Sequence, residues 1–333
     1  MRKEFRWRVI CFRLDMKKIL AACAMAVLLT MRADAAPADE LRAGRIYPTP
    51  GDGTYTSIYD IEYAAPTGFS LKLDLHIPDD PGPHPAILWL HTGAWISGDK
   101  SGGPALRQAR RGYAVASVQY RFAPNSIFPA QLEDAKAAVR WLRANATRYN
   151  LDPDRIGVFG ASAGGHLAAL LGTTGDVAEL EGLVHGNGGY SSRVRAVVDY
   201  YGPTDLLQLA AQSLPCTFLD PNASFAPPSL LIGCPIQSCP DRTALSNPIR
   251  YISPDDPPFL IVHGTEDCLV PWQQSQLLFD ALRGAGGDVT LQIIPGAQHG
   301  GSEFDEQSIK QLVSDFLDRH LKGPERRRRP VRR

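Results

Sequence analysis

The chain has 333 residues, of which 44% are hydrophobic and 21% are charged, with 35 basic and 35 acidic residues. A chain of this length and composition can bury a full hydrophobic core, and α/β proteins of about 250–300 residues commonly form one domain. The sequence shows no internal repeat and no low-complexity interior, which excludes solenoid and fibrous architectures.

Residues 1–35 are predicted to be a signal peptide. The basic pair 17–18 precedes an apolar run over 19–29, and Ala33-Asp34-Ala35 is a small-residue cleavage site. Met16 is the natural start for such a segment. Because the eleven-residue run is too short to cross a bilayer, we expect no stable membrane span. The sequence therefore predicts export, with a secreted or periplasmic protein as the product.

A lipid anchor is the alternative for this segment, because Leu20-Ala-Ala-Cys23 resembles a lipoprotein box with Cys23 as the lipidated residue.

Removal of the segment takes eight basic and three acidic residues from the 35 of each kind, which leaves a net charge of −5. Six arginines lie within 326–333. We therefore expect a folded domain over 36–322, a basic disordered tail over 323–333, and no nucleic-acid partner.

The hydrophobic pattern predicts strands that alternate with helices. Residues 71–77 alternate with period two, which indicates a half-buried strand. A continuously apolar run at 86–90 is typical of a strand buried on both faces, and further strands are predicted at 113–120, 156–159, 194–200, 258–263 and 289–294. Apolar residues three or four apart predict helices over 128–145 and 167–171, and residues 151–154 read as a turn. The sequence therefore predicts an α/β fold with a mostly parallel sheet.

A serine stands between the predicted strand 156–159 and the helix that follows it. The motif is Gly160-x-Ser162-x-Gly164, the spacing of a nucleophile elbow. A turn sharp enough to expose the serine hydroxyl brings backbone segments close together, and glycines two residues away on each side leave room for that approach. The first N–H groups of the following helix point at any oxyanion formed there. Ser162 is the predicted nucleophile.

Four segments together resemble the esterase/lipase branch of the α/β-hydrolase superfamily. They occur in the order His91-Thr-Gly-Ala-Trp95, Gln119-Tyr-Arg-Phe-Ala-Pro124, Gln131-Leu-Glu-Asp-Ala-Lys-Ala-Ala-Val-Arg-Trp141 and Gly160-Ala-Ser-Ala-Gly-Gly-His166. The similarity covers about 59–321 and is greatest to exported bacterial carboxylesterases of the hormone-sensitive-lipase-like and feruloyl-esterase-like kinds. It implies a mostly parallel, twisted central sheet flanked by helices.

The resemblance also implies an oxyanion hole in the loop after strand 86–90. Backbone N–H groups of Gly93 and Ala94, together with that of Ala163, are expected to hold the negative charge that develops on the substrate. His91 is expected to orient the loop. The family usually has His-Gly-Gly before this loop, and here Thr92 replaces the first glycine.

The order serine, acid, histidine along the chain is the one that α/β hydrolases use. The resemblance places the acid at Asp267, in the loop after strand 258–263, and the base at His299, after the last predicted strand. His299 would take the proton of the serine, and Asp267 would orient the imidazole. Glu266, Asp199 and Asp205 are the alternative acids. The other histidines are predicted to be structural or exposed: His76, His84, His166, His185, His263 and His320.

Residues 208–251 are predicted to be a cap-like insertion of the kind that shapes the substrate pocket in this superfamily. Four cysteines remain beyond the signal peptide, and an even number in an exported chain favours disulfides over metal ligation. Cys234 and Cys239 could close a small loop, which would leave Cys216 to pair with Cys268. The other two connectivities stay open, and no spacing indicates a metal site.

Three functions follow from the sequence. The favoured one is a serine hydrolase that cleaves a small-molecule carboxylic ester through an acyl-enzyme, with neither a metal nor an organic cofactor. An amidase or peptidase with the same three residues is the second. A non-catalytic binding protein on a hydrolase scaffold is the third, and it normally lacks the serine or the histidine that this chain retains. The sequence carries no signal of oligomeric state.

Overall fold

The computed structural model describes residues 55–322 except 67 and 176. The predicted signal peptide with its Cys23 and the predicted basic tail lie outside the described residues. One eight-stranded sheet has the order β1-β2-β4-β3-β5-β6-β7-β8. Its strands are β1 (Tyr55–Ala64), β2 (Leu71–Pro78), β3 (His84–Leu90), β4 (Ala114–Val118), β5 (Leu151–Ala161), β6 (Val197–Tyr200), β7 (Phe259–Gly264) and β8 (Val289–Ile294).

The sheet is mostly parallel, as the sequence predicts. β2 pairs antiparallel with β1 and with β4, and every other neighbouring pair is parallel. Strands β3, β4, β6 and β7 are buried along their whole length. Their largely apolar sequences follow from this position, because helices cover a parallel sheet on both faces.

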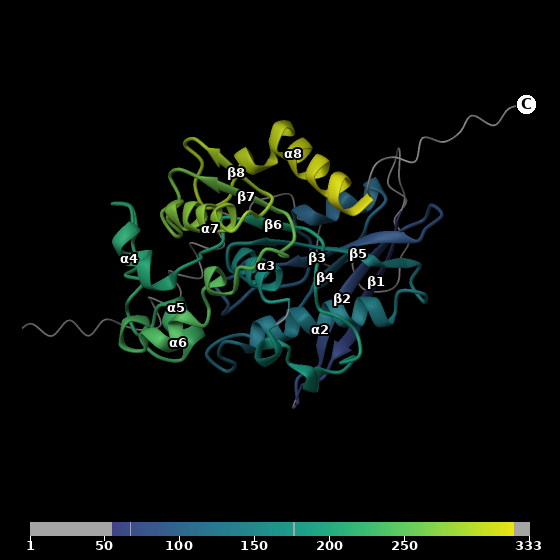
Figure 1. Cartoon of the computed structure of the whole chain (residues 1–333), viewed down its shortest axis with the longest axis horizontal. Coiled ribbons are helices and arrows are strands. Elements are labelled where there is room, and N and C mark those ends of the chain that lie inside the picture. The colour runs from purple at the N-terminus through teal and green to yellow at the C-terminus, as the bar shows by residue number, and fades with distance from the viewer. Residues whose placement is uncertain (1–54, 67, 176, 323–333) are drawn as a thin grey trace, which may run out of the picture. The chain divides into compact units, whose positions relative to one another are not determined.

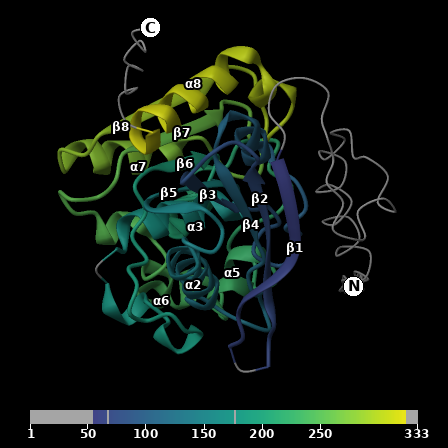
Figure 2. The ribbon, with the colours of Figure 1, turned by 90° about the vertical axis from the view of Figure 1, so that its right-hand side faces the viewer.

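Helices lie on both faces of the sheet (Figure 1). Figure 2 shows α8 (Gln307–Leu317) on one side of the sheet and α2 (Ala130–Ala144) and α3 (Ala163–Thr173) on the other. The buried residues form two clusters accordingly. One contains α2, α3 and α7 (Gln273–Gly284), and the second contains α8 and the 3-10 helix η2 (Pro104–Arg111). The sheet is thus the middle layer of three.

Two strands differ from the sequence prediction. β5 begins within the predicted turn: its Leu151 pairs with His84 of β3, and a register shift follows before the next pair at Ile156. The residues between the two pairs form a bulge inside the strand. β1 has no counterpart in the prediction. Most of its side chains are only partly buried, so its sequence lacks both the continuous apolar run and a clear alternation.

The insertion over 208–251 consists of short helices: α4 (Leu209–Gln212), α5 (Pro227–Ile232), α6 (Pro240–Ala244) and the 3-10 turns between and after them. A disulfide between Cys234 and Cys239 lies within it. A second disulfide joins Cys216 to Cys268, which lies in the loop after β7. The structure therefore confirms the pairing that the sequence favours. The second bond fastens the insertion to a loop at the carboxyl end of the sheet.

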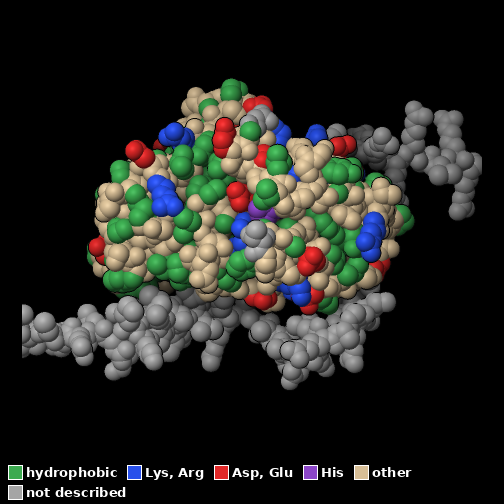
Figure 3. Space-filling model, turned by 90° about the horizontal axis from the view of Figure 1, so that it is seen from below, with side chains coloured by type: hydrophobic (Ala, Val, Ile, Leu, Met, Phe, Trp, Pro, Cys, Tyr) green, Lys and Arg blue, Asp and Glu red, His purple; other side chains and the backbone are tan. Residues whose placement is uncertain are grey.

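On the face seen from below in Figure 3, acidic and basic side chains lie scattered among hydrophobic and uncharged ones. Within the described residues, every helix is too short or too polar to cross a membrane.

Candidate active site

Ser162 lies at the turn between β5 and α3 with a φ of 55°, a left-handed conformation that is costly for a residue other than glycine. Glycines make the turn possible. A Cβ on Gly160 would collide with the backbone of Gly164, and a Cβ on Gly164 would collide with the carbonyl of Leu90. The helix α3 starts at Ala163, directly after this sharp turn, and contains the predicted apolar run 167–171.

A hydrogen-bonded chain of three side chains includes this serine. Nε2 of His299 lies 2.8 Å from Oγ of Ser162, and Nδ1 of His299 lies 2.6 Å from Oδ2 of Asp267. The three residues follow β5, β7 and β8, whose carboxyl ends meet at one edge of the parallel sheet. The structure thus brings together the residues predicted as nucleophile, base and acid. The distances are those that proton transfer between such groups requires, and the catalytic roles stay a prediction.

The carboxylate of Asp267 is fully buried and surrounded by donors. Its Oδ1 accepts hydrogen bonds from the backbone N–H groups of Leu269 and Val270, at 2.9 and 2.8 Å. Its Oδ2 lies 2.6 Å from Nδ1 of His299 and 3.1 Å from Nε2 of His263. Burial by itself raises the pKa of Asp267, but the charge of His299 and the hydrogen bonds of both imidazoles outweigh it and hold the pKa well below the usual range. Asp267 is therefore ionised at neutral pH.

The alternative acids do not contact the histidine. Within the described residues, neither Asp199, Asp205 nor Glu266 hydrogen-bonds to His299. Asp205 caps the 3-10 helix η5 (Leu206–Gln208), and the side chain of Glu266 is exposed. Asp199 is buried on β6. The geometry therefore favours Asp267 over all three.

Asp199 leads to a prediction about stability. Burial raises the pKa of its carboxyl group to about 7, although a hydrogen bond from the backbone N–H of Gly202 lowers it. Because this pKa exceeds the unfolded value of 3.8, the stabilisation is complete below about pH 4 and is lost as the pH rises through 7. Asp199→Asn removes the titration and keeps an acceptor for Gly202. The difference in unfolding free energy, variant minus wild type, should increase by about 2–3 kcal/mol as the pH rises from 5 to 8. Urea denaturation of both proteins across this pH range measures it. Parallel pH profiles of the two proteins would contradict this.

The predicted oxyanion loop has an unusual backbone. Gly93, Ala94 and Trp95 all have positive φ, at 125°, 52° and 61°. A Cβ on Gly93 would collide with the carbonyl of Ser97, so this position requires glycine. The N–H groups of Gly93, Ala94 and Ala163 donate to no group of the described residues. Ala163 is the first residue of α3, where helix geometry leaves the N–H without a partner. Donors without a partner are what the predicted oxyanion hole requires.

His91 holds the start of this loop. Its Nδ1 lies 2.6 Å from the carbonyl oxygen of Thr92, and its ring stacks on Tyr120 with centroids 4.3 Å apart. The ring also fills the space beside Gly98, where a Cβ would collide with it. This is the orienting position expected from the sequence. It shows how the loop is supported although Thr92 replaces the usual glycine.

His263 is the residue at this site whose position the sequence did not indicate. It was expected to be structural or exposed, and it is fully buried with its Nε2 facing Asp267. The one signal in the sequence is its place at the end of strand 258–263, four residues before the acid. Among the described residues, no group of three or more His, Cys, Asp and Glu side chains could hold a metal ion.

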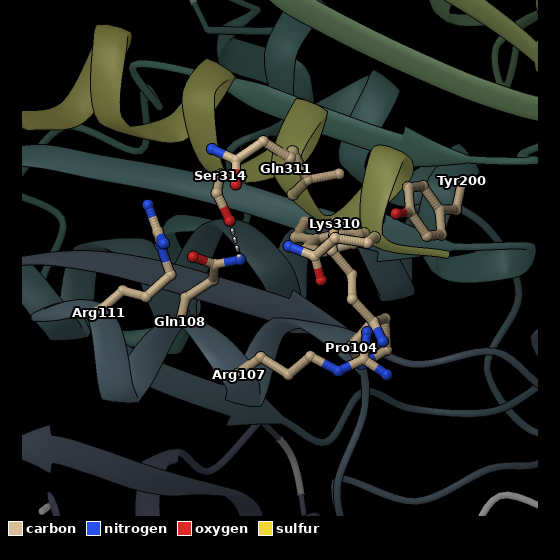
Figure 4. A pocket seen from close by; sticks show the side chains of 11 residues that line it. Pro104, Arg107, Gln108, Arg111, Tyr200, Lys310, Gln311 and Ser314 are labelled. Atoms are coloured by element: carbon tan, nitrogen blue, oxygen red, sulfur yellow. Dashed lines mark hydrogen bonds between the residues drawn. The ribbon is translucent and has the colours of Figure 1, made fainter. Parts of the chain in front are cut away.

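A separate cavity of about 170 Å³ lies between η2 and α8 (Figure 4). In it Nε2 of Gln108 lies 3.4 Å from Oγ of Ser314, and the labelled Arg107, Arg111 and Lys310 extend around it. Its lining includes none of the predicted site residues. This cavity is therefore distinct from the site on the elbow.

The parallel sheet, the serine on its strained turn and the histidine and aspartate beside it define an α/β hydrolase of the esterase branch. The chain belongs to the BD-FAE family, whose family model matches residues 73–282.

Named relatives agree with this assignment. Esterase LipC of Mycobacterium tuberculosis is 32% identical over 227 residues, which are 67% of this chain and 54% of that protein. The truncated form of a carbohydrate esterase from gut microbiota is 30% identical with a TM-score of 0.74, over 83% of this chain and 99% of that one. A bifunctional GH43-CE protein of Bacteroides eggerthii is 35% identical with a TM-score of 0.72, over 80% and 35%. The chain thus spans about half the length of LipC.

Proposed function

We propose that the protein is a serine hydrolase that cleaves carboxylic esters through an acyl-enzyme. The observation that carries this proposal is the hydrogen-bonded chain from Ser162 through His299 to Asp267, placed on the elbow of a chain whose named relatives are esterases. A small-molecule ester is the proposed substrate.

The geometry supports a two-step reaction. Because Asp267 is ionised, it accepts a hydrogen bond from Nδ1–H of His299, which leaves Nε2 free to accept the hydroxyl proton of Ser162. As Oγ attacks the ester carbonyl, the proton moves to Nε2 and the carbonyl oxygen gains negative charge. The N–H groups of Gly93, Ala94 and Ala163 are the proposed donors to that oxygen.

Collapse of this tetrahedral intermediate breaks the bond to the leaving group. His299 returns the proton to the departing alkoxide, so an alcohol leaves and an acyl-serine remains. Water then attacks the acyl carbon, His299 takes its proton, and the second collapse releases the carboxylic acid and restores the serine hydroxyl. Asp267 stays ionised throughout and stabilises the imidazolium.

We also propose that the protein is exported to the periplasm or secreted. The predicted signal peptide is the first support for this location. The second is the pair of disulfides, since such bonds persist in oxidising compartments and are rare in the cytosol.

Covalent labelling tests the proposed chemistry. The purified protein with its disulfides intact should hydrolyse at least one p-nitrophenyl ester of a panel from acetate to laurate. A fluorophosphonate should stop that turnover, add one phosphonyl group by intact mass, and appear on the peptide that contains Ser162. Folded protein that neither turns over an ester nor takes up the label would contradict the proposal.

A further inference from the structure

Two imidazoles face the same oxygen of Asp267. Nδ1 of His299 lies 2.6 Å from Oδ2, and Nε2 of His263 lies 3.1 Å from the same atom. His299 is also hydrogen-bonded to Ser162. The other hydrogen-bond partners of His263 are the hydroxyl of Ser275 and the carbonyl of Val270. The proposed reaction gives His263 no step of its own.

The neighbours of His263 set its tautomer. Its Nε2 lies within hydrogen-bond distance of two acceptors, Oδ2 of Asp267 at 3.1 Å and the carbonyl oxygen of Val270 at 2.9 Å. Neither acceptor has a proton to give, so Nε2 carries the hydrogen. Nδ1 lies 2.6 Å from the hydroxyl of Ser275, a fully buried residue of α7 that can donate to it. The Nε2–H of His263 is thus directed at the carboxylate.

This hydrogen bond completes the set of donors around Asp267. Backbone N–H groups fix Oδ1, and the two imidazoles fix Oδ2. Without His263, the one side chain of the described residues that holds Oδ2 would be His299, the group that must move its proton during turnover. A carboxylate held by fixed donors keeps its orientation while His299 changes charge.

We propose that His263 is a positioning residue, which fixes the carboxylate of Asp267 and through it the imidazole of His299. This inference rests on the proposed function. It assigns no contact between His263 and the substrate.

The direction of the expected pH effect follows from hydrogen bonding. A donor to a carboxylate stabilises the anion and weakens it as a base. Loss of the His263 donor leaves more negative charge for His299, so the imidazolium should persist to higher pH. The acid limb of kcat/KM should therefore move upward. The turnover number should fall as well, because the carboxylate is held less firmly.

The other titratable groups near His263 and His299 do not account for such a shift of the acid limb. The ring of Tyr201 lies 4.7 Å from that of His299 and 6.4 Å from that of His263, measured between centroids. Burial raises the pKa of Tyr201 above its usual range, and the charges of Asp267 and Asp305 raise it further, so the phenol stays neutral. The loop of Asp267 adds the exposed Glu266 and the disulfide-bonded Cys268.

Three variants separate positioning from packing. His263→Phe removes the donor and keeps a ring, whereas His263→Gln keeps an amide N–H near the place of Nε2. His76→Phe is the matched control, because His76 is also buried and bonded to a serine hydroxyl, Oγ of Ser57 at 2.7 Å. His76 lies on β2, five strands along the sheet from β7.

The assay measures kcat and KM for p-nitrophenyl acetate from pH 5 to 9. For His263→Phe we expect kcat to fall about 10–100-fold with little change in KM. The midpoint of the acid limb should rise by about half a pH unit. His263→Gln should restore most of both quantities. His76→Phe should lower the melting temperature and leave the pH profile unchanged.

Two results would overturn the proposal. One is a folded His263→Phe with wild-type kcat and acid limb; the other is an equal loss in the Phe and Gln variants with no shift of the limb, which is the signature of packing. If His263→Phe does not fold, Ser275→Ala replaces it. Loss of the hydroxyl that holds Nδ1 leaves the ring less firmly oriented toward Oδ2, so the acid limb should shift in the same direction by a smaller amount. Ser162→Ala in the same assay separates the two hypotheses, since turnover that survives it contradicts the proposed function itself.

Discussion

Replacement of Ser162 by alanine is expected to lower kcat/KM for p-nitrophenyl acetate by about a million-fold. Alanine keeps the Cβ that the left-handed backbone at this position already tolerates, so the elbow itself should not change. What disappears is the oxygen that lies 2.8 Å from Nε2 of His299 and that forms the acyl bond. The free energy of unfolding should change little, because the lost hydrogen bond is partly exposed.

Steady-state kinetics and thermal unfolding on the same preparation check this result. Ser117→Ala is the matched control: its hydroxyl is buried on β4 and bonds to the carbonyl of Lys100, away from the site. That variant should lose stability and keep its turnover number. Residual turnover above about 1% in Ser162→Ala, with contaminating activity excluded by the label, would contradict an acyl-serine mechanism.

The second large effect is expected for Asp267→Asn, which should lower kcat about ten-thousand-fold at neutral pH. The amide has nearly the size of the carboxylate, so the loop after β7 should keep its fold. However, its nitrogen would carry hydrogens where Oδ2 now accepts from two imidazoles, and His299 would be held in the wrong tautomer or turned away. The charge that stabilises the imidazolium would also be gone.

The neighbouring carboxylate provides the control for this prediction. Glu266→Gln removes one negative charge one residue away, on an exposed side chain that forms no hydrogen bond with His299. Its kcat should stay within about twofold of wild type, because exposed charges are largely screened. Comparable losses in the Glu266 and Asp267 variants, measured by the same ester assay, would show that net charge at this edge matters rather than the particular hydrogen bond.

The parts of this molecule that the sequence predicts best are those that local chemistry determines. Buried parallel strands are largely apolar, so β3 and β7 stand out as apolar runs. The elbow stands out because its turn excludes a Cβ at Gly160 and Gly164. By contrast, β1 is a partly exposed edge strand, and the start of β5 contains Asp152 and Pro153, which are typical of turns.

The remaining features depend on contacts between distant segments. The order of residues along the chain left four carboxylates as possible acids, and only the path of the loop after β7 turns Asp267 toward His299. The same path brings His263 against that carboxylate. The sequence separation of four residues between His263 and Asp267 does not by itself determine how far apart their side chains lie. The pairing of Cys216 with Cys268 spans 52 residues and followed from elimination rather than from any local pattern.

His299, the proposed catalytic base, depends on a strand at the edge of the sheet. β8 pairs with β7 alone, most of its side chains are only partly buried, and His299 stands five residues beyond its end. β5, which precedes Ser162, lies between two parallel neighbours. Opening of an edge strand needs less free energy than unfolding of the whole domain. We therefore expect fraying at β8 to displace His299 before the whole domain unfolds, so an effort to prolong the activity should begin at the β7–β8 pair.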